Sequence, residues 1–219
     1  MAQRPKQAQP ASAPRLYLVT PWIEDPAAFT DALAPALGAA DVAALLLRLR
    51  EADERTLINR VKTLAPIAQA KDVAVILDGA PEIVARGGAD GVHARGSDAL
   101  EAALRALKPE RIVGAGGLVS RHDAMSAGEA GVDYVMFGEP DAQDRRPGFE
   151  AVLERVAWWA EVFEIPCVGF ASSLDEVDQL VRAGAEFIAL GDAVWSAPEG
   201  PATFLAEVAK LLIAPEPAR

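Results

Sequence analysis

Short aliphatic runs alternate with longer segments of helical period along most of the chain. The runs are nearly continuously apolar, which is typical of parallel strands that are buried on both faces. We expect strands at residues 15–20, 42–48, 73–77, 91–93, 111–115, 134–137, 167–170 and 187–190. The apolar spacing after these strands predicts helices at about residues 26–37, 53–70, 81–86, 98–107, 121–130, 149–163, 174–183 and 202–213. This alternation indicates a series of βα units.

Three phrases of one kind separate a predicted helix from the next strand. They are Gly87-Gly88-Ala89-Asp90, Ala130-Gly131-Val132-Asp133 and Ala183-Gly184-Ala185-Glu186. Glycine is favoured just after a helix because it adopts the left-handed conformation without strain. Eight βα units in about 200 residues therefore predict a single (βα)8 TIM barrel of the α/β class. A doubly wound open sheet is the alternative, but no Gly-x-Gly-x-x-Gly follows the first strand.

The composition fits one globular domain and argues against several classes of function. Of the 219 residues, 51% are hydrophobic and 24% are charged, which is enough apolar material for a substantial core. The 21 basic and 32 acidic residues give a net charge of −11. This charge opposes binding to nucleic acid or to anionic membranes, which begins by neutralising phosphates with Lys and Arg. The single cysteine, Cys167, rules out an intrachain disulfide and a thiolate zinc cluster.

The two ends of the chain carry no periodic apolar face. Residues 1–14 contain Arg4 and Lys6 but lack the apolar core of a signal peptide, so we expect a disordered tail there. No later run reaches the roughly 20 apolar residues of a membrane span. We therefore expect a cytoplasmic protein with a barrel at residues 15–213 and a short tail at 214–219.

Polar residues that follow the strands are the site candidates, since a TIM barrel builds its active site there. Arg48 and Arg50 are alternate residues at the end of the second strand, so in an extended chain they share one side. Two guanidinium groups can grip a phosphate or pyrophosphate, although rim arginines bonded to nearby acidic residues are the alternative. Other polar residues at strand ends are Thr20, Arg95 and Glu139.

Asp78 and Asp98 follow the third and fourth strands, which are neighbours in the predicted barrel. Two carboxylates beside a pyrophosphate suit Mg²⁺, which takes one or two protein oxygens and leaves its other positions to water and phosphate. Helix capping is the alternative for both aspartates. His93 ends a buried strand, where it is either an acid–base group or a core histidine with satisfied hydrogen bonds.

The last two strands lead to residues that oppose phosphate. Ser173-Leu174-Asp175-Glu176 matches a capping box, in which side chains satisfy the helix-start amides that a phosphate would otherwise receive. Asp192 places a carboxylate after the eighth strand. We therefore expect this side of the barrel mouth to be closed to phosphate.

Three segments resemble the motifs of one family. Residues 16–20 (LYLVT) resemble the first strand of thiamine-phosphate synthase and of its close relative, the thiazole tautomerase. Residues 88–93 (GADGVH) resemble the family motif GADGVHLG, and residues 131–138 (GVDYVMFG) resemble GADYIGFGP. Order and spacing agree from about residue 15 to residue 195. The resemblance implies a TIM barrel that joins a hydroxymethylpyrimidine pyrophosphate to a thiazole phosphate, with Mg²⁺ present, and releases pyrophosphate.

The resemblance also implies roles for residues on the pyrophosphate side. The family's strand-two motif, Gln-x-Arg-x-Lys, aligns with residues 48–52, so Arg50 keeps the arginine and Ala52 replaces the lysine. The metal carboxylates of the family align with Asp78 and Asp98. This side of the site is largely retained.

The thiazole-phosphate side departs from the family pattern. The serine after strand five aligns with Gly116, and the Gly-Gly phosphate cradle after strand seven aligns with Ala171-Ser172. A Thr-x-Thr-Lys segment after strand six falls on Gln143, Asp144, Arg145 and Arg146. Only the basic charge of that segment is kept.

Two functions are therefore compatible with the sequence. One is a thiamine-phosphate-synthase-like enzyme of thiamine biosynthesis, with Mg²⁺ on Asp78 and Asp98. It would bind a small phosphorylated heterocycle through Arg48, Arg50, His93, Gln143, Arg145 and Arg146. The other is a barrel without catalysis that acts as a ligand-binding or interaction protein, which the capping box and Asp192 favour.

Two adjacent tryptophans bear on the oligomeric state. Trp158 and Trp159 lie about 100° apart around the predicted helix, so both cannot point into the same core stripe. Large aromatic side chains are enriched at protein interfaces. We therefore expect a homodimer with one of these rings at its interface.

Overall fold

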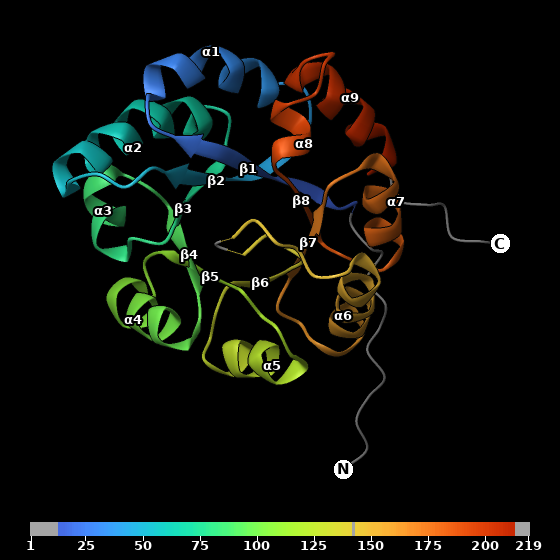
Figure 1. Ribbon diagram of the computed structural model, residues 1–219. Coiled ribbons are helices and arrows are strands. Elements are labelled where there is room, and N and C mark those ends of the chain that lie inside the picture. The colour runs from blue at the N-terminus through green and yellow to red at the C-terminus, as the bar shows by residue number, and fades with distance from the viewer. Residues whose placement is uncertain (1–12, 142, 213–219) are drawn as a thin grey trace.

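Eight parallel strands close into a barrel in the computed structural model, which describes residues 13–141 and 143–212 (Figure 1). Each strand pairs with the next one along the chain, and the eighth pairs with the first. The predicted (βα)8 TIM barrel is confirmed, and the open sheet is excluded. The strands are β1 (Arg15–Ile23), β2 (Val42–Leu49), β3 (Ala74–Asp78), β4 (Gly91–Arg95), β5 (Ile112–Gly116), β6 (Tyr134–Phe137), β7 (Cys167–Ala171) and β8 (Phe187–Leu190).

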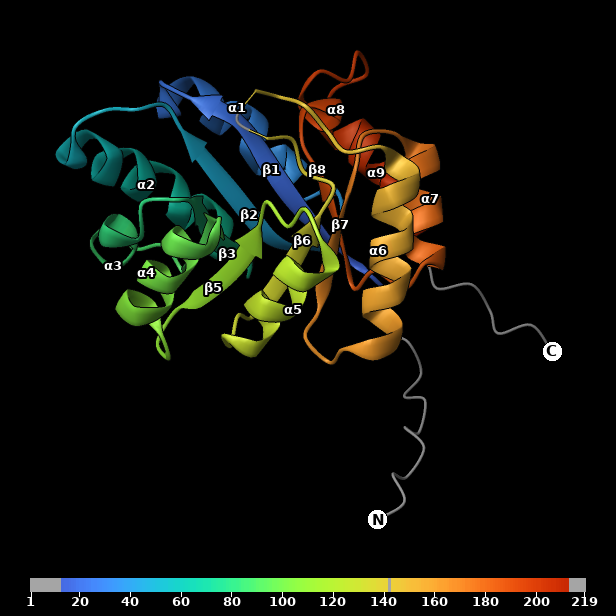
Figure 2. The same ribbon diagram turned by 60° about the horizontal axis from the view of Figure 1, so that its bottom comes forward.

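Helices surround the strands on the outside, as the end view and the turned view both show (Figures 1 and 2). They are α1 (Pro26–Ala36), α2 (Glu54–Gln69), α3 (Val84–Gly87), α4 (Ser97–Leu107), α5 (Arg121–Glu129), α6 (Phe149–Val162), α7 (Leu174–Arg182), α8 (Asp192–Trp195) and α9 (Pro201–Leu211). A 3-10 turn, η1 (Pro81–Ile83), precedes α3, so the helix expected at residues 81–86 is split. Among the described residues, no helix has both the length and the apolar character to cross a membrane.

The three glycine phrases perform the same task in three βα units. Their glycines have positive φ angles of 81°, 90° and 93° at Gly88, Gly131 and Gly184. The acidic residue two positions later accepts a hydrogen bond from a backbone amide of the preceding strand. These pairs are Asp90 with Val75 (2.8 Å), Asp133 with Val113 (2.7 Å) and Glu186 with Cys167 (2.9 Å). Each phrase therefore reverses the chain and ties two neighbouring strands together.

The core has two layers. One lies between the strands and the helices, and it contains the fully buried Trp159. The other fills the barrel and includes Tyr17, Tyr134 and Phe170, and the two tyrosine rings lie 5.5 Å apart. Gly114 lies beside the second ring, because a β-carbon there would overlap Tyr134. The barrel interior is therefore packed and carries two phenol groups.

The predicted tails fall almost wholly outside the described residues. Of residues 1–14, only Ala13 and Pro14 are described, and residues 213–219 are not. The barrel itself begins at Arg15, whose side chain donates to both oxygens of Asp41 at 2.9 Å. The disordered tail expected at residues 1–14 and the short tail expected at 214–219 stay predictions.

Candidate active site

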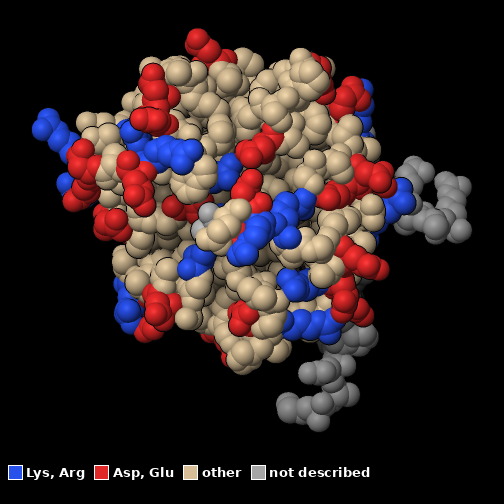
Figure 3. Space-filling view, in the orientation of Figure 1, with Lys and Arg blue, Asp and Glu red and all other residues tan. Residues whose placement is uncertain are grey.

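Two adjoining cavities open at the carboxyl ends of the strands. The first, which we call the mouth cavity, has a volume of about 540 Å³, and its wall includes Trp22, Arg48, Arg50, Asp78, Arg95 and Asp192. The second, the loop cavity, has a volume of about 530 Å³, and its wall includes Arg95, Gly117, Glu139, Arg145 and Arg146. The loop between β6 and α6 crosses the centre of the barrel in Figure 1 and contributes to both walls. Charged side chains of both signs gather over this centre in Figure 3.

Arg48 and Arg50 both approach the ring of an exposed tryptophan. The guanidinium carbons of the two arginines lie 5.5 Å and 5.9 Å from the centre of the Trp22 ring, which is a favourable cation–π arrangement. Arg48 is fixed further by Thr20, whose hydroxyl accepts from its backbone amide at 3.0 Å and whose carbonyl accepts from its Nε. The indole of Trp22 stays 47% exposed. Both arginines line the mouth cavity, and phosphate binding by them stays a prediction.

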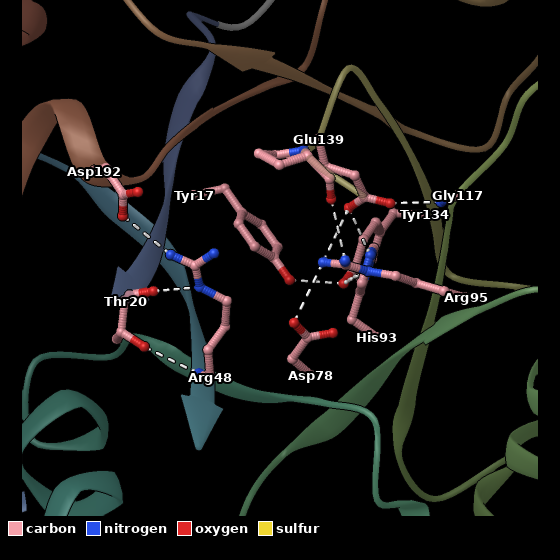
Figure 4. Close-up of polar contacts among 11 residues, drawn as sticks. Tyr17, Thr20, Arg48, Asp78, His93, Arg95, Gly117, Tyr134, Glu139 and Asp192 are labelled. Atoms are coloured by element: carbon pink, nitrogen blue, oxygen red, sulfur yellow. Dashed lines mark hydrogen bonds and ion pairs between the residues drawn. The ribbon is translucent and has the colours of Figure 1, made fainter. Parts of the chain in front are cut away.

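Asp192, the carboxylate after the eighth strand, forms an ion pair with Arg48. Its Oδ1 accepts from Nη2 of Arg48 at 3.1 Å, and its side chain is 68% exposed (Figure 4). An ion pair with such an exposed carboxylate contributes little stability. An anionic ligand in the mouth cavity would therefore compete with Asp192 for Arg48 at low cost.

The two predicted metal ligands lie in different surroundings. Asp78 ends β3 with its side chain only 8% exposed, and its Oδ2 accepts from Nη2 of Arg95 at 3.2 Å. Asp98 is exposed in the first turn of α4, where it accepts from Ser97 Oγ at 3.3 Å, and it does not line the mouth cavity. Among the described residues, no three His, Cys, Asp or Glu side chains are placed to bind a metal together. Because Asp78 is bonded to Arg95 and Asp98 lies outside the mouth cavity, the two aspartates do not form a joint site, and Mg²⁺ binding stays a prediction.

A buried hydrogen-bonded chain lies beneath the cavities (Figure 4). The hydroxyls of Tyr17 and Tyr134 are 2.6 Å apart, and the Tyr134 hydroxyl lies 3.0 Å from Nδ1 of His93. Nε2 of His93 lies 2.8 Å from Oε2 of Glu139, whose other oxygen accepts from the backbone amide of Gly117. All four side chains are buried. His93 has the satisfied hydrogen bonds of a core histidine, and its substrate-binding role stays a prediction.

Burial and neighbouring charges set the ionisation of Glu139 and of the two tyrosines in this hydrogen-bonded cluster. Burial raises the pKa of Glu139, but the attraction and hydrogen bond of His93, the charge of Arg95 and the Gly117 amide together lower it below its usual value. Burial raises the pKa of both Tyr17 and Tyr134, so both phenols keep their protons. An ionised Glu139 can only accept hydrogen bonds, so Nε2–H of His93 donates to its carboxylate.

Arg146 occupies the start of α7, where the resemblance implies a phosphate cradle. It donates to the carbonyl of Phe170 at 2.9 Å, to Glu176 at 3.1 Å and to the hydroxyl of Ser172. Ser173 accepts from the amide of Glu176 at 3.2 Å, which confirms one half of the expected capping box. The carboxylate of Glu176 accepts from the amide of Ser172 at 2.7 Å, whereas the capping box predicts the amide of Ser173 as its donor. Side chains of the protein thus fill this end of the mouth.

The other predicted residues of the loop bind mainly to each other. Arg145 donates to Asp141 at 2.8 Å and 3.0 Å and to the side-chain oxygen of Gln143 at 3.0 Å. The amides and side chain of Arg145, together with the amide of Gln143, lower the pKa of Asp141. Arg145 lines the loop cavity, whereas Gln143 lines neither cavity. Substrate binding by both residues stays a prediction.

The sequence placed Arg95 and Glu139 at strand ends without giving either a role. A signal for Glu139 was present, because it stands where the quoted motif GADYIGFGP has its proline. The second signal is Gly116, since a β-carbon there would overlap both Glu139 and His93. Gly116 leaves the space and Glu139 supplies the carboxylate for the buried pair of His93 and Glu139.

Comparisons with known proteins agree with this architecture. A family model described as thiamine monophosphate synthase matches residues 16–194. The chain is 42% identical to a thiamine-phosphate synthase of Rhodospirillum centenum, over 90% of this chain and 97% of that protein. It is 38% identical to one of Hyphomonas neptunium, over 89% and 92% of the two chains. The solved thiamine phosphate pyrophosphorylase of Pyrococcus furiosus has the same fold, with a TM-score of 0.74 at 24% identity, over 90% of this chain and 95% of that one.

Proposed function

The chain belongs to the thiamine monophosphate synthase family, and we therefore propose that it joins a hydroxymethylpyrimidine pyrophosphate to a thiazole phosphate in thiamine biosynthesis. A cytoplasmic location accompanies this proposal, because both substrates would be small phosphorylated metabolites. The proposal is supported most directly by the mouth cavity, which combines arginines with an exposed aromatic ring at the carboxyl ends of the strands.

The mouth cavity suits a heterocycle that carries a diphosphate. Its volume of about 540 Å³ falls in the usual range for small-molecule sites. Arg48 and Arg50 offer planar donor groups that bind phosphate oxygens in pairs. Trp22, which both arginines approach and which is 47% exposed, offers a surface for stacking an aromatic ring.

The proposed reaction needs little besides positioning and charge stabilisation. The methylene carbon of the pyrimidine gains a bond to the thiazole nitrogen, and its bond to the pyrophosphate oxygen breaks. The pyrophosphate leaves with the electron pair of that bond. Arg48 and Arg50 would stabilise this departing negative charge, which is a largely electrostatic form of catalysis. Asp78 is bonded to Arg95 and Asp98 lies outside the mouth cavity, so the arginines carry this charge stabilisation in the proposed reaction.

A ligand-binding barrel without catalysis is the second candidate. The occupied start of α7 favours it, since Ser173, Glu176 and Arg146 take the groups that a thiazole phosphate would need. Such a protein would bind the pyrimidine pyrophosphate and form no product.

A product assay separates the two candidates. The purified protein is incubated with both substrates, with and without Mg²⁺, and thiamine phosphate is measured by mass spectrometry. We expect product from the wild type and at least about a tenfold loss in Arg50→Ala, since one charged contact to phosphate is removed. Arg182→Ala is the control, because Arg182 is exposed on α7 and, within residues 13–141 and 143–212, forms an ion pair with Asp178 alone. Binding of the pyrimidine pyrophosphate without any product would support the second candidate.

A further inference from the structure

Arg95 lies between two buried carboxylates at the base of the mouth cavity. Its Nη2 donates to Asp78 at 3.2 Å and lies 3.8 Å from Oε2 of Glu139 (Figure 4). Its Nη1 donates to the carbonyl of Pro140 at 3.2 Å. The two carboxylate side chains are only 8% and 6% exposed, so each needs a nearby positive charge. One guanidinium group serves both.

The same guanidinium keeps donor groups for a ligand. A guanidinium has five N–H donors. The hydrogen bonds described use one on Nη2 and one on Nη1, and the buried Nε has no partner among the residues that the structure describes. The side chain of Arg95 is 30% exposed and lines both cavities. Arg95 can therefore hold Asp78 and face a ligand at the same time.

A carboxylate beside a diphosphate is unfavourable unless a cation lies between them. Asp78 lines the mouth cavity together with Arg48 and Arg50, so its charge would repel an anion bound there. Mg²⁺ would need octahedral oxygen ligands at about 2.1 Å. The carboxylate of Asp78 is already bonded to Arg95, and Asp98 lies outside the cavity. The cation that the geometry supplies is the guanidinium.

We propose that Arg95 takes the place of a divalent cation in this site, bridging Asp78 to the diphosphate of the ligand. The inference rests on the proposed function, which supplies the diphosphate. It makes diphosphate binding independent of metal and assigns a binding role to Arg95. Removal of Arg95 frees Asp78, and a divalent cation can then bind where the guanidinium was.

Calorimetry with inorganic pyrophosphate alone tests this proposal. In the presence of a chelator, the wild type should bind pyrophosphate, and Mg²⁺ should change its Kd by less than about threefold. Arg95→Ala should lose at least about tenfold in affinity with the chelator and regain most of it with Mg²⁺. Arg105→Ala, an exposed arginine on α4 that pairs with Glu101, should behave as the wild type. Electron paramagnetic resonance should detect bound Mn²⁺ in Arg95→Ala and not in the wild type.

Asp78→Asn keeps the proposal testable if Arg95→Ala does not fold. This variant keeps the shape of the side chain and removes its charge. If Arg95 is the cation, Asp78→Asn should still bind pyrophosphate with the chelator. If Asp78 holds a metal, the variant should lose the binding that Mg²⁺ supports in the wild type.

Three results would overturn the proposal. They are strict dependence of wild-type binding on Mg²⁺, full affinity of Arg95→Ala in chelator, and no pyrophosphate binding under either condition. The outcome is separable from that of the proposed function. Metal-independent binding without product would refute only the synthase activity, whereas product formation together with pyrophosphate binding that requires Mg²⁺ would refute only the role of Arg95.

Discussion

The buried pair of His93 and Glu139 depends on a residue that has no side chain. Gly116 ends β5 beside this pair, and any β-carbon there would overlap Oε1 of Glu139 and Nε2 of His93. The resemblance implies a serine at this position. A serine and the buried pair exclude each other, so Gly116 and Glu139 form one structural unit of this chain.

Gly116→Ser should therefore destabilise the protein. Overpacking a closed site costs roughly 1–3 kcal/mol, which corresponds to a fall of roughly 2–10 °C in Tm for a chain of this size. Gly148→Ser is the matched control, because a β-carbon there meets nothing within 4 Å and serine is a favourable residue at the N-cap of α6. Thermal denaturation followed by circular dichroism measures both. Equal Tm values for the two variants would show that His93 and Glu139 can shift to make room for the serine.

Glu139→Gln should change how stability depends on pH. The pKa of Glu139 is lower in the folded state than the value of about 4.3 expected for the unfolded chain. Its ionisation therefore contributes stability above that pH, and the contribution is lost as the pH falls through the lower folded pKa. The wild type should be more stable than Glu139→Gln by roughly 1–3 kcal/mol near neutrality.

Melting curves recorded from neutral to acidic pH check this prediction. The difference in Tm should be constant above about pH 5 and should shrink as the solution becomes more acidic. Glu154→Gln is the control, because Glu154 has a side chain that is 73% exposed and forms a surface ion pair with Arg121. A difference that stays constant into acid would mean that Glu139 carries a proton in the folded protein.

The sequence could predict some of these residues and not others. Arg48 and Arg50 were predicted together because strand alternation alone puts them on one side. The roles of Arg95 and Glu139 depend on the path of the loop after β6, which brings Glu139 back over β4. Local periodicity carries no information about such a path. The side-chain partners of Asp78 were unpredictable for the same reason.

At the scale of elements, the strand pattern predicted the barrel, and the differences lie at the strand ends. The first strand was expected to stop at Thr20, before Pro21. It continues to Ile23 through a register shift between Val19 and Trp22, which leaves the proline unpaired. This extension pairs Trp22 with Arg48 and so builds the aromatic wall of the mouth cavity. Helix α8 was missed because four residues are too few to show a helical period.

The start of α7 yields a prediction about phosphate. Glu176 accepts from the Ser172 amide and from Arg146, so it holds both groups that an anion would use. Glu176→Gln removes the charge and weakens this competition. Inorganic phosphate should therefore bind Glu176→Gln at least about fivefold more tightly than the wild type, as measured by calorimetry.

Asp175→Asn is the matched control for this effect. Asp175 lies in the same first turn of α7, and no hydrogen bond joins it to Arg146 within the described part of the chain. Equal gains in the two variants would mean that the charge of the helix start matters and the specific bonds of Glu176 do not.

At the scale of the whole molecule, the two adjacent tryptophans differ in burial, as their positions about 100° apart around the helix require. Trp159 is fully buried and donates to the carbonyl of Ile165 at 2.7 Å. Trp158 is half-buried, and the guanidinium of Arg121 lies 4.8 Å from the centre of its ring. Val162, one turn further along α6, is 58% exposed. The outer surface of α6 thus presents an apolar pair, Trp158 and Val162, next to a basic group.

The expected homodimer can be tested on this surface. Residues four apart on a helix are neighbours, so a charge at position 162 would lie beside the Trp158 ring and oppose burial of both against a second copy. Val162→Glu should sediment as a monomer at concentrations where the wild type is dimeric, whereas Val162→Thr, which keeps the shape, should stay mostly dimeric. Because Val162 lies outside the core, the charge variant should keep its barrel circular dichroism spectrum. Wild-type protein that sediments as a monomer across a wide concentration range would refute the dimer, and a dimer that Val162→Glu leaves intact would move its interface away from α6.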